Sequence, residues 1–150
     1  MDEQKYEVLK LKYQLCFPLY ACSRETIRLY KPYLDELDLT YTQYITLLVL
    51  WERKHCTVKE LGSVLYLDSG TLTPLLKKLE QKGLLTRKRS TEDERNLIVT
   101  ITEAGEQLKD KALYIFDSMY DKVPLTPDES LTLYELLYKM LASADAHNHG

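Results

Sequence analysis

The sequence holds few of the residues that mark small disulfide-rich or metal-stabilised proteins. Among 150 residues there are three cysteines, three histidines, five glycines and five prolines. The cysteines, Cys16, Cys22 and Cys56, are odd in number and have no CxxC spacing, which argues against a disulfide framework and against a zinc site. The histidines stand in a polar tail and in an expected loop. We therefore expect no bound metal and no cofactor.

Long apolar runs are also missing. No stretch approaches the roughly 20 apolar residues that span a bilayer. The charged N-terminus, MDEQKYEVLK, has no signal-peptide core. These absences predict a cytoplasmic protein with no membrane partner. What is present, 45% hydrophobic and 29% charged residues, is typical of an ordered, helix-rich domain of this length.

The charges are segregated along the chain. The net charge of −3 alone argues weakly against DNA binding. Residues 77–89, however, contain six basic residues and one acidic residue, a local charge of +5. Residues 103–150 contain nine acidic and four basic residues, a local charge of −5. For DNA binding, the positive charge of residues 77–89 therefore matters more than the net charge of the whole chain.

Apolar residues at helical spacing, helix caps and helix breakers predict a mainly α-helical chain with one small β-hairpin wing. The first helix is expected over about residues 3–30, interrupted or bent near Pro18 and ended by Lys31-Pro32. Thr57 and Glu60 have the spacing of a capping box, which predicts the start of a short helix. The other expected elements are helices at about 42–53, 57–65, 68–81, 102–120 and 128–144, and strands at about 84–88 and 97–101 joined by polar residues 90–96.

Two short helices with a tight link, followed by a basic strand and a polar hairpin tip, describe a winged helix-turn-helix. The second helix has the size that fits the major groove, and small polar side chains at its start can reach base edges. Arg95 near the wing tip can enter the minor groove, with its guanidinium oriented by Asp93. The candidate DNA-binding residues are Ser69, Gly70, Thr71, Thr73, Lys77 and Lys78 on the helix and Arg87, Lys88, Arg89, Asp93 and Arg95 on the wing.

Two other interpretations fit part of this pattern. The charges can simply solvate a surface helix and hairpin, which is the commoner role of a charge run. A winged helix can also serve as a protein-interaction module, but that role needs no basic wing tip. The pattern and the charge together favour DNA binding.

Cys16 lies in an apolar stretch of the first expected helix, with Lys12 one turn before it and Tyr20 one turn after it on the same face. A lone helical cysteine is more often a small hydrophobic residue of the core. A sensor cysteine must instead be partly thiolate, stabilised by hydrogen-bond donors or positive charge. Tyr30 lies on the same face of the expected helix as Cys16, but 14 residues of continuous helix separate the two by roughly 21 Å. Tyr30 and Tyr41 could therefore reach Cys16 only from an antiparallel partner chain or after a sharp chain reversal.

Four segments together resemble one known family. They are residues 14–20 (QLCFPLY), 41–44 (YTQY), 67–76 (LDSGTLTPLL) and 93–95 (DER). This combination is similar to the MarR family of transcriptional regulators and, within it, to the organic hydroperoxide resistance regulators and their relatives of the SarZ and MgrA kind. The similarity covers about residues 10–105.

The resemblance implies a homodimer that presents one winged helix from each subunit to a pseudo-palindromic, double-stranded operator. It also implies a single MarR-type domain over residues 1–150. Within that domain, a helical dimerisation region would comprise about residues 1–40 and 106–146. The winged helix-turn-helix lobe would comprise about residues 41–105.

The resemblance further implies that Cys16 is the peroxide sensor. Tyr30 and Tyr41 would come from the other subunit to hydrogen-bond it, with Tyr20 nearby. Because no cysteine follows residue 56, the chain is similar to the one-cysteine members of the family. In those members a sulfenic acid forms, and it is then capped as an adduct with a small cellular thiol or over-oxidised.

We therefore expect a redox-sensing repressor, and not an enzyme, that leaves its operator when organic hydroperoxide oxidises Cys16. Pro18 departs from the family pattern and Cys22 is an extra thiol, so either could alter peroxide selectivity. Three alternatives stay open. The first is a MarR-type regulator released by a small aromatic or quinone ligand, and the second is a broader SarZ- or MgrA-like thiol-switch regulator. The third, a thiol peroxidase, lacks a resolving cysteine and an arginine paired with the thiol.

Overall fold

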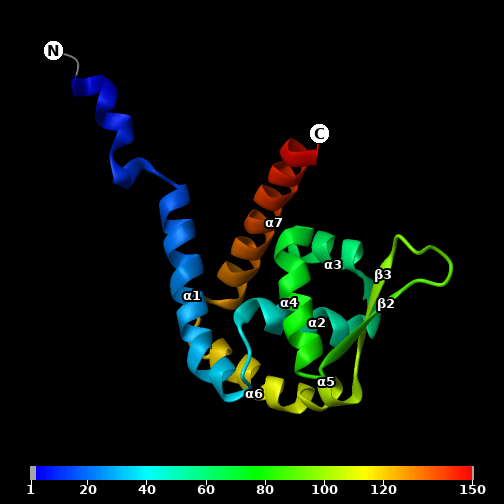
Figure 1. Ribbon diagram of the computed structural model, residues 1–150. Coiled ribbons are helices and arrows are strands. Elements are labelled where there is room, and N and C mark those ends of the chain that lie inside the picture. Colours follow the sequence, from blue (N-terminus) through cyan, green and yellow to red (C-terminus); the bar gives the residue numbers. More distant parts are fainter. Residues whose placement is uncertain (1–2, 150) are drawn as a thin grey trace. The chain divides into compact units, whose positions relative to one another are not determined.

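The computed structural model describes residues 3–149, with side chains described up to His147. The chain divides into two compact units, Met1–Phe116 and Asp117–Gly150. Helices dominate the described residues, and a three-stranded antiparallel sheet lies in the first unit (Figure 1). The predicted fold class, mainly helical with a small β wing, is confirmed.

Three helices at the centre of the first unit begin at strong N-caps. Thr40, Thr57 and Asp68 each accept a hydrogen bond from the backbone N–H three residues on, which satisfies one of the free donors of a helix start. The Glu60 carboxylate in turn accepts a hydrogen bond from the backbone N–H of Thr57, so the predicted capping box is present. The three helices are α2 (Tyr41–Arg53), α3 (Val58–Leu65) and α4 (Ser69–Gln81).

Leucines from these three helices form the core of the first unit. The inward face predicted for α4 is buried, as its 3.6-residue spacing requires. Each fully buried leucine stabilises the fold by about 1.5–3 kcal/mol through loss of exposed apolar surface. The core therefore holds α4 against its neighbours and leaves its opposite face to solvent. These leucines are Leu47, Leu50, Leu61, Leu72, Leu75, Leu76 and Leu79.

The sheet has the strand order β1-β3-β2. β2 (Leu85–Arg89) and β3 (Leu97–Ile101) form the predicted antiparallel hairpin. β1 (His55–Thr57) pairs with the other edge of β3, with Cys56 opposite Val99. The prediction of a loop at His55 was wrong, because three residues are too few to show an alternating pattern and the strand forms only through its distant partner.

The helical region predicted over residues 3–30 is interrupted just before Cys16, close to the interruption or bend predicted near Pro18. It contains two 3-10 helices, Glu3–Leu9 and Leu11–Tyr13, followed by α1 (Cys16–Glu36). Pro18 lies in the first turn of α1, where backbone N–H groups have no partner within the helix. Pro18 therefore costs α1 no hydrogen bond within the helix.

Pro32 lies inside α1, so the prediction that Lys31-Pro32 ends the first helix was wrong. The proline removes the hydrogen bond to the carbonyl of Arg28, but both residues are exposed and water can satisfy that carbonyl. The helix instead ends where Asp38 adopts a φ of 54° and the Leu39 N–H bonds to the Leu34 carbonyl.

Two helices, α5 (Glu103–Gln107) and α6 (Lys109–Tyr120), replace the single helix predicted over 102–120. The Gly105 carbonyl, which a continuous helix would pair with a backbone N–H, accepts a hydrogen bond from Trp51 Nε1 at 2.8 Å. A distant side chain thus competes with helix continuation at this point, and sequence periodicity gives no sign of it.

The second unit contains α7 (Pro127–His149), which runs beyond the end predicted at 144. A capping box formed by Thr126 and Glu129 starts this helix. Several of its apolar side chains are exposed, including Leu131 and Leu136. None of the described helices is long and apolar enough to cross a bilayer.

Candidate nucleic-acid interface and thiol site

The first turn of α4 presents a row of small polar residues to solvent. Ser69, Gly70, Thr71 and Thr73 are all exposed. Asp68 accepts a hydrogen bond from the Thr71 N–H at 2.8 Å, which holds the pKa of that carboxyl below its usual range. Thr73 Oγ1 donates to the Ser69 carbonyl at 2.8 Å, which orients the hydroxyl and leaves its lone pairs available. The residues predicted to read bases therefore lie together at one exposed helix end.

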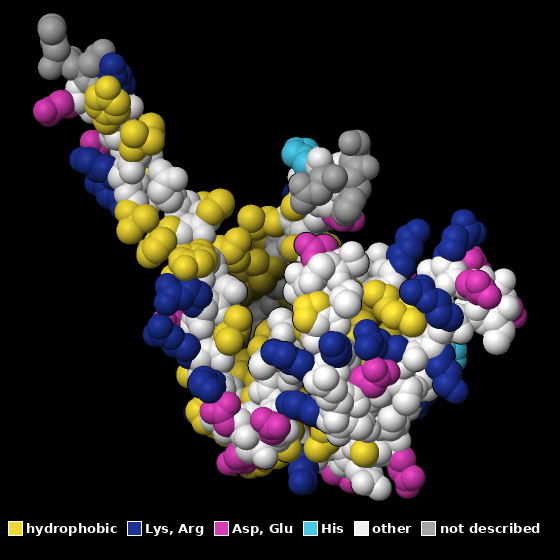
Figure 2. Space-filling model, in the orientation of Figure 1, with side chains coloured by type: hydrophobic (Ala, Val, Ile, Leu, Met, Phe, Trp, Pro, Cys, Tyr) yellow, Lys and Arg dark blue, Asp and Glu magenta, His cyan; other side chains and the backbone are white. Residues whose placement is uncertain are grey.

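Basic side chains extend this surface along α4 and onto β2. Lys77 and Lys78 are exposed on α4, and Lys88 and Arg89 are exposed on β2. Arg89 Nη1 also donates to the backbone carbonyl of Glu94 at 3.3 Å. Figure 2 shows Lys and Arg side chains gathered over the helix and the hairpin. Such a concentration of positive charge attracts a phosphate backbone.

The wing tip holds Arg95 in a defined orientation. Its Nε and Nη2 donate to Oδ1 and Oδ2 of Asp93 at 3.0 and 3.1 Å, and its backbone N–H donates to Oδ1 at 3.1 Å. These bonds lower the pKa of the Asp93 carboxyl. The Arg95 side chain is nevertheless 91% exposed. A planar donor group is thus oriented at the tip while it stays open to a partner.

Arg87 is held differently from the other predicted DNA-binding residues. Its Nη2 donates to Glu80 Oε1 at 3.1 Å and its backbone N–H donates to Glu80 Oε2 at 2.9 Å. These bonds lower the pKa of the Glu80 carboxyl. The Arg87 side chain is only 21% exposed, and its Nε has no hydrogen-bond partner within the described part of the chain. Arg87 therefore ties β2 to α4, and its guanidinium is not presented to solvent beside Lys88 and Arg89.

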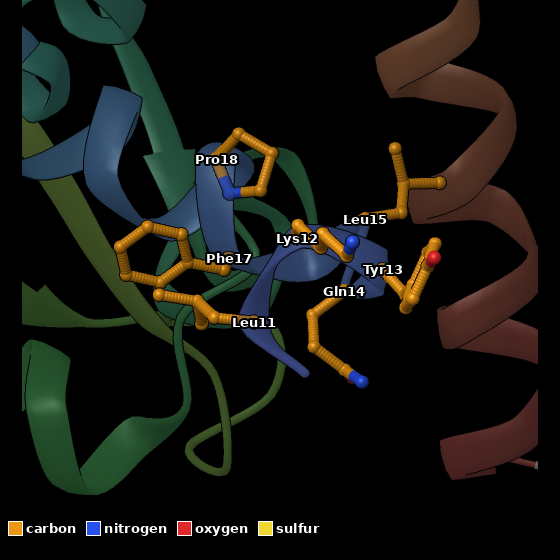
Figure 3. Close-up of a pocket in the computed structure, with 7 residues that line it drawn as sticks. All are labelled: Leu11, Lys12, Tyr13, Gln14, Leu15, Phe17 and Pro18. Carbon is orange, nitrogen blue, oxygen red and sulfur yellow. The ribbon is translucent and has the colours of Figure 1, made fainter. Parts of the chain in front are cut away.

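Cys16 is the first residue of α1 and is exposed, so it is not a core residue of the single chain. Lys12 belongs to a 3-10 helix and the chain is extended at Gln14, so the prediction of a continuous helical face from Lys12 to Cys16 was wrong. The residues on both sides of Cys16 line an open, mainly apolar pocket (Figure 3). They are Leu11, Lys12, Tyr13, Gln14, Leu15, Phe17 and Pro18.

The predicted tyrosines do not all lie near Cys16 in one chain. Tyr20 follows Cys16 by one turn of α1, and its hydroxyl accepts a hydrogen bond from Arg24 Nη1 at 3.5 Å. Tyr30 lies farther along the same unbroken helix, at the distance of roughly 21 Å expected for 14 residues. Tyr41 is the first residue of α2, and its ring centroid lies 5.1 Å from that of Tyr30.

Tyr44 completes this tyrosine cluster, and the sequence analysis missed it. Its ring centroid lies 5.9 Å from that of Tyr30 and 6.3 Å from that of Tyr41. Burial and the two neighbouring phenols raise the pKa of Tyr44 to about 12, and burial raises the pKa of Tyr30 and Tyr41 as well. The spacing of Tyr44, Leu47 and Trp51 along one helix face was the available signal.

The remaining thiols lie in different environments. Cys22 is exposed on α1, whereas Cys56 is buried in β1, where burial raises the pKa of its thiol. Within the described part of the chain, no group of three or more His, Cys, Asp or Glu side chains is arranged to hold a metal ion.

Comparison with known proteins points to one group of regulators. A family model described as transcriptional regulator SarA/Rot matches residues 28–112. The organic hydroperoxide resistance transcriptional regulator of Bacillus subtilis is 49% identical over 97% of this chain and 99% of its own length. The regulator SarZ of Staphylococcus saprophyticus is 46% identical over 85% of this chain and 87% of its own length.

Solved structures agree with this grouping. The structure of reduced AbfR bound to DNA is 37% identical, with a TM-score of 0.77 over 95% of this chain and 99% of that chain. A mutant of MarR from E. coli complexed with operator DNA is 30% identical, with a TM-score of 0.77 over 85% of this chain and 93% of that chain. The chain therefore belongs to the MarR family of transcriptional regulators, in the group that contains the organic hydroperoxide resistance regulators and SarZ.

Proposed function

We propose that this protein is a homodimeric repressor that binds a pseudo-palindromic operator and releases it when an organic hydroperoxide oxidises Cys16. The observation that carries the proposal is the presence, in one chain, of an exposed basic winged helix and an exposed cysteine flanked by an apolar pocket. In this role the protein consumes one peroxide per thiol and does not turn over as an enzyme.

DNA contact divides between base reading and phosphate binding. Small hydroxyls at the start of α4 would read base edges in the major groove, and the α4 lysines would bind phosphates. Arg95 would enter the adjacent minor groove, where narrow grooves attract arginine. Lys88 and Arg89 would contact the backbone beside the wing. Arg87, which Glu80 holds, would act by fixing the wing to α4.

Apolar side chains at both ends of the chain support a second copy as partner. Leu9 and Leu15 in the N-terminal region are 71% and 76% exposed. Leu131 in the second unit is 58% exposed. Burying such surface between copies would gain about 25 cal/mol per Å². This supports assigning residues 1–40 and 106–146 to a dimerisation region.

The sensor step is an oxygen transfer to sulfur. The Cys16 thiolate attacks the peroxide, an S–O bond forms, the O–O bond breaks, and the alkoxide leaves as the alcohol after it takes a proton. The product is a sulfenic acid. A small cellular thiol then condenses with it, so that an S–S bond forms and water leaves. The apolar residues that line the pocket would hold the alkyl part of the peroxide.

Tyrosines would carry this change to the DNA-binding surface. Since Tyr30 lies roughly 21 Å along α1 from Cys16, and Tyr41 packs against Tyr30, the two would hydrogen-bond the thiol of the partner subunit. Oxidation adds bulk at that point and breaks these bonds. The two winged helices would then lose the separation that matches adjacent major grooves.

The test compares wild type, Cys16→Ser and Cys22→Ser on a duplex that the reduced protein selects from a random library. Each protein is titrated against the duplex before and after stoichiometric cumene hydroperoxide, and a thiol reductant is then added. We expect release of wild type and Cys22→Ser, restored by reductant, and no release of Cys16→Ser. Cys22→Ser is the matched control because it removes a second exposed thiol of the same helix.

Other outcomes separate the alternatives. If wild type stays bound after oxidation, the redox proposal is wrong and a regulator released by an aromatic or quinone ligand replaces it. If Cys16→Ser is released normally, the sensor lies elsewhere. Repeated peroxide consumption with a thiol reductant would instead indicate a peroxidase.

A further inference from the structure

One lysine ties the C-terminal end of α4 to the turn between α1 and α2. Lys82 directly follows α4, and its Nζ donates to the backbone carbonyl of Asp38. The same Nζ lies 3.4 Å from Gln43 Oε1 and 3.4 Å from Asp38 Oδ2. An ammonium group with three protons thus faces three acceptors, all contributed by that turn and the helix start after it.

The turn that Lys82 contacts joins α1 and α2, the two helices that carry Tyr30, Tyr41 and Tyr44. Gln43 Oε1 also accepts a hydrogen bond from the Thr40 N–H at 3.1 Å, as part of the capping box that starts α2. Tyr41 is the first residue after that cap and packs against Tyr30. Lys82 therefore bonds to the same cap that sets the position of Tyr41.

These contacts differ from those of an ordinary surface ion pair. Lys31 and Asp35 pair at 3.0 Å within α1, with side chains that are 71% and 59% exposed. The Lys82 side chain is only 30% exposed, and its acceptor Gln43 is 4% exposed. The Asp38 carboxylate is 94% exposed, so solvent screens its part of the contact. The contact rests on the buried amide and the backbone carbonyl.

We propose that Lys82 is a positioning residue that couples the tyrosine cluster to α4. The inference rests on the proposed function, because it assigns to Lys82 the transfer of the redox change to the DNA-reading helix. When oxidation of the partner's thiol moves Tyr30 and Tyr41, the cap of α2 moves with them. Lys82 then displaces the C-terminal end of α4, and the helix carries that displacement to its other end.

The test measures the ratio of operator Kd after oxidation to operator Kd before oxidation. It uses full-length Lys82→Met, which keeps the aliphatic stem but has no donor, and Lys82→Arg, which keeps charge and donors. Lys31→Met is the control, because it removes a lysine that pairs with an aspartate within a single helix. Cumene hydroperoxide is the oxidant, and loss of free thiol confirms equal oxidation in every variant.

For Lys82→Met we expect the ratio to fall at least about fivefold below that of wild type, the lower end of ordinary coupling between sites. Lys82→Arg and Lys31→Met should stay within about twofold of wild type. A lysine that only stabilises the fold would shift the unfolding temperature and leave the ratio unchanged, and that result would overturn the proposal. If Lys82→Met does not fold, Lys82→Gln serves with the same expectation. Failure of wild type to respond to peroxide would instead refute the proposed function, and the coupling with it.

Discussion

Removal of the guanidinium at the wing tip should weaken DNA binding without weakening the fold. In Arg95→Ala the lost side chain is 91% exposed and pairs with Asp93, two residues before it in the wing. Exposed ion pairs contribute little to folding, so the unfolding midpoint should stay within about 4 °C of wild type. Each dimer, however, would lose two cations from its DNA-binding surface.

The salt dependence of operator binding shows how large the effect of Arg95→Ala should be. Each cation that neutralises a phosphate adds about 0.9 to the slope of log affinity against log salt, so two wings account for about 1.8. Between 50 and 200 mM salt, a fourfold change, wild type should lose about twelvefold more affinity than Arg95→Ala. Operator titrations at four salt concentrations, followed by fluorescence anisotropy, measure this slope.

Two comparisons make the result decisive. Arg28→Ala removes an exposed arginine that pairs with Glu25 on α1, outside the winged lobe, and should leave the slope unchanged. Asp93→Asn keeps the cation but replaces one of the two carboxylate oxygens that orient it with an NH2 group, so the two-point pairing is lost. If only the net charge of the wing matters, Asp93→Asn should bind every duplex more tightly than wild type does. If the orientation of the Arg95 guanidinium matters, Asp93→Asn should show a lower ratio of operator affinity to random-duplex affinity. An unchanged slope in Arg95→Ala would refute the wing-tip contact.

Two further substitutions test the core. In Gly105→Ala the new Cβ would lie 2.3 Å from the Leu84 carbonyl oxygen, so we expect a loss of about 1–3 kcal/mol in the free energy of unfolding by urea. Gly70→Ala, whose Cβ would lie 3.4 Å from Asp68 Oδ1 in ordinary van der Waals contact, is the control and should gain about 0.5–1 kcal/mol, so an equal effect of both substitutions would contradict this reasoning. Because the pKa of Tyr44 is raised from 10.0 to about 12, the phenol stays protonated to a higher pH in the folded chain than in the unfolded chain. The contribution of this phenol to the free energy of unfolding is fully present below pH 10. It is lost as the pH rises from 10 to 12, by about 2–3 kcal/mol in total. Urea unfolding across this range should show that extra loss in wild type and not in Tyr44→Phe, and parallel curves would show that Tyr44 titrates normally.

Local signals in the sequence were enough to predict much of the winged helix. The leucine spacing of α4 specified its buried face, and the Thr57 to Glu60 spacing specified the start of α3. Asp93 and Arg95 pair as their separation of two residues suggested. Each of these features depends on residues within one turn or one hairpin, which is why the sequence alone reveals them.

Features that depend on distant partners could not be predicted in this way. β1 exists because His55–Thr57 pairs with β3, more than 40 residues on. The break between α5 and α6 depends on Trp51, and the place of Arg87 depends on Glu80. Pro32 was expected to end α1, because the rule for proline takes no account of water at an exposed carbonyl.

The hydrogen bonds that Arg87 donates to Glu80 have a consequence for the operators that the protein would select. Because they join α4 to β2, the proposed major-groove contacts of α4 and minor-groove contacts of the wing belong to a single rigid body in each subunit. A conformational change that starts at the thiol then leaves the preferred half-site sequence unaltered and changes only the preferred number of base pairs between two half-sites. Selection with reduced and with oxidised protein should therefore recover the same half-site with different spacers.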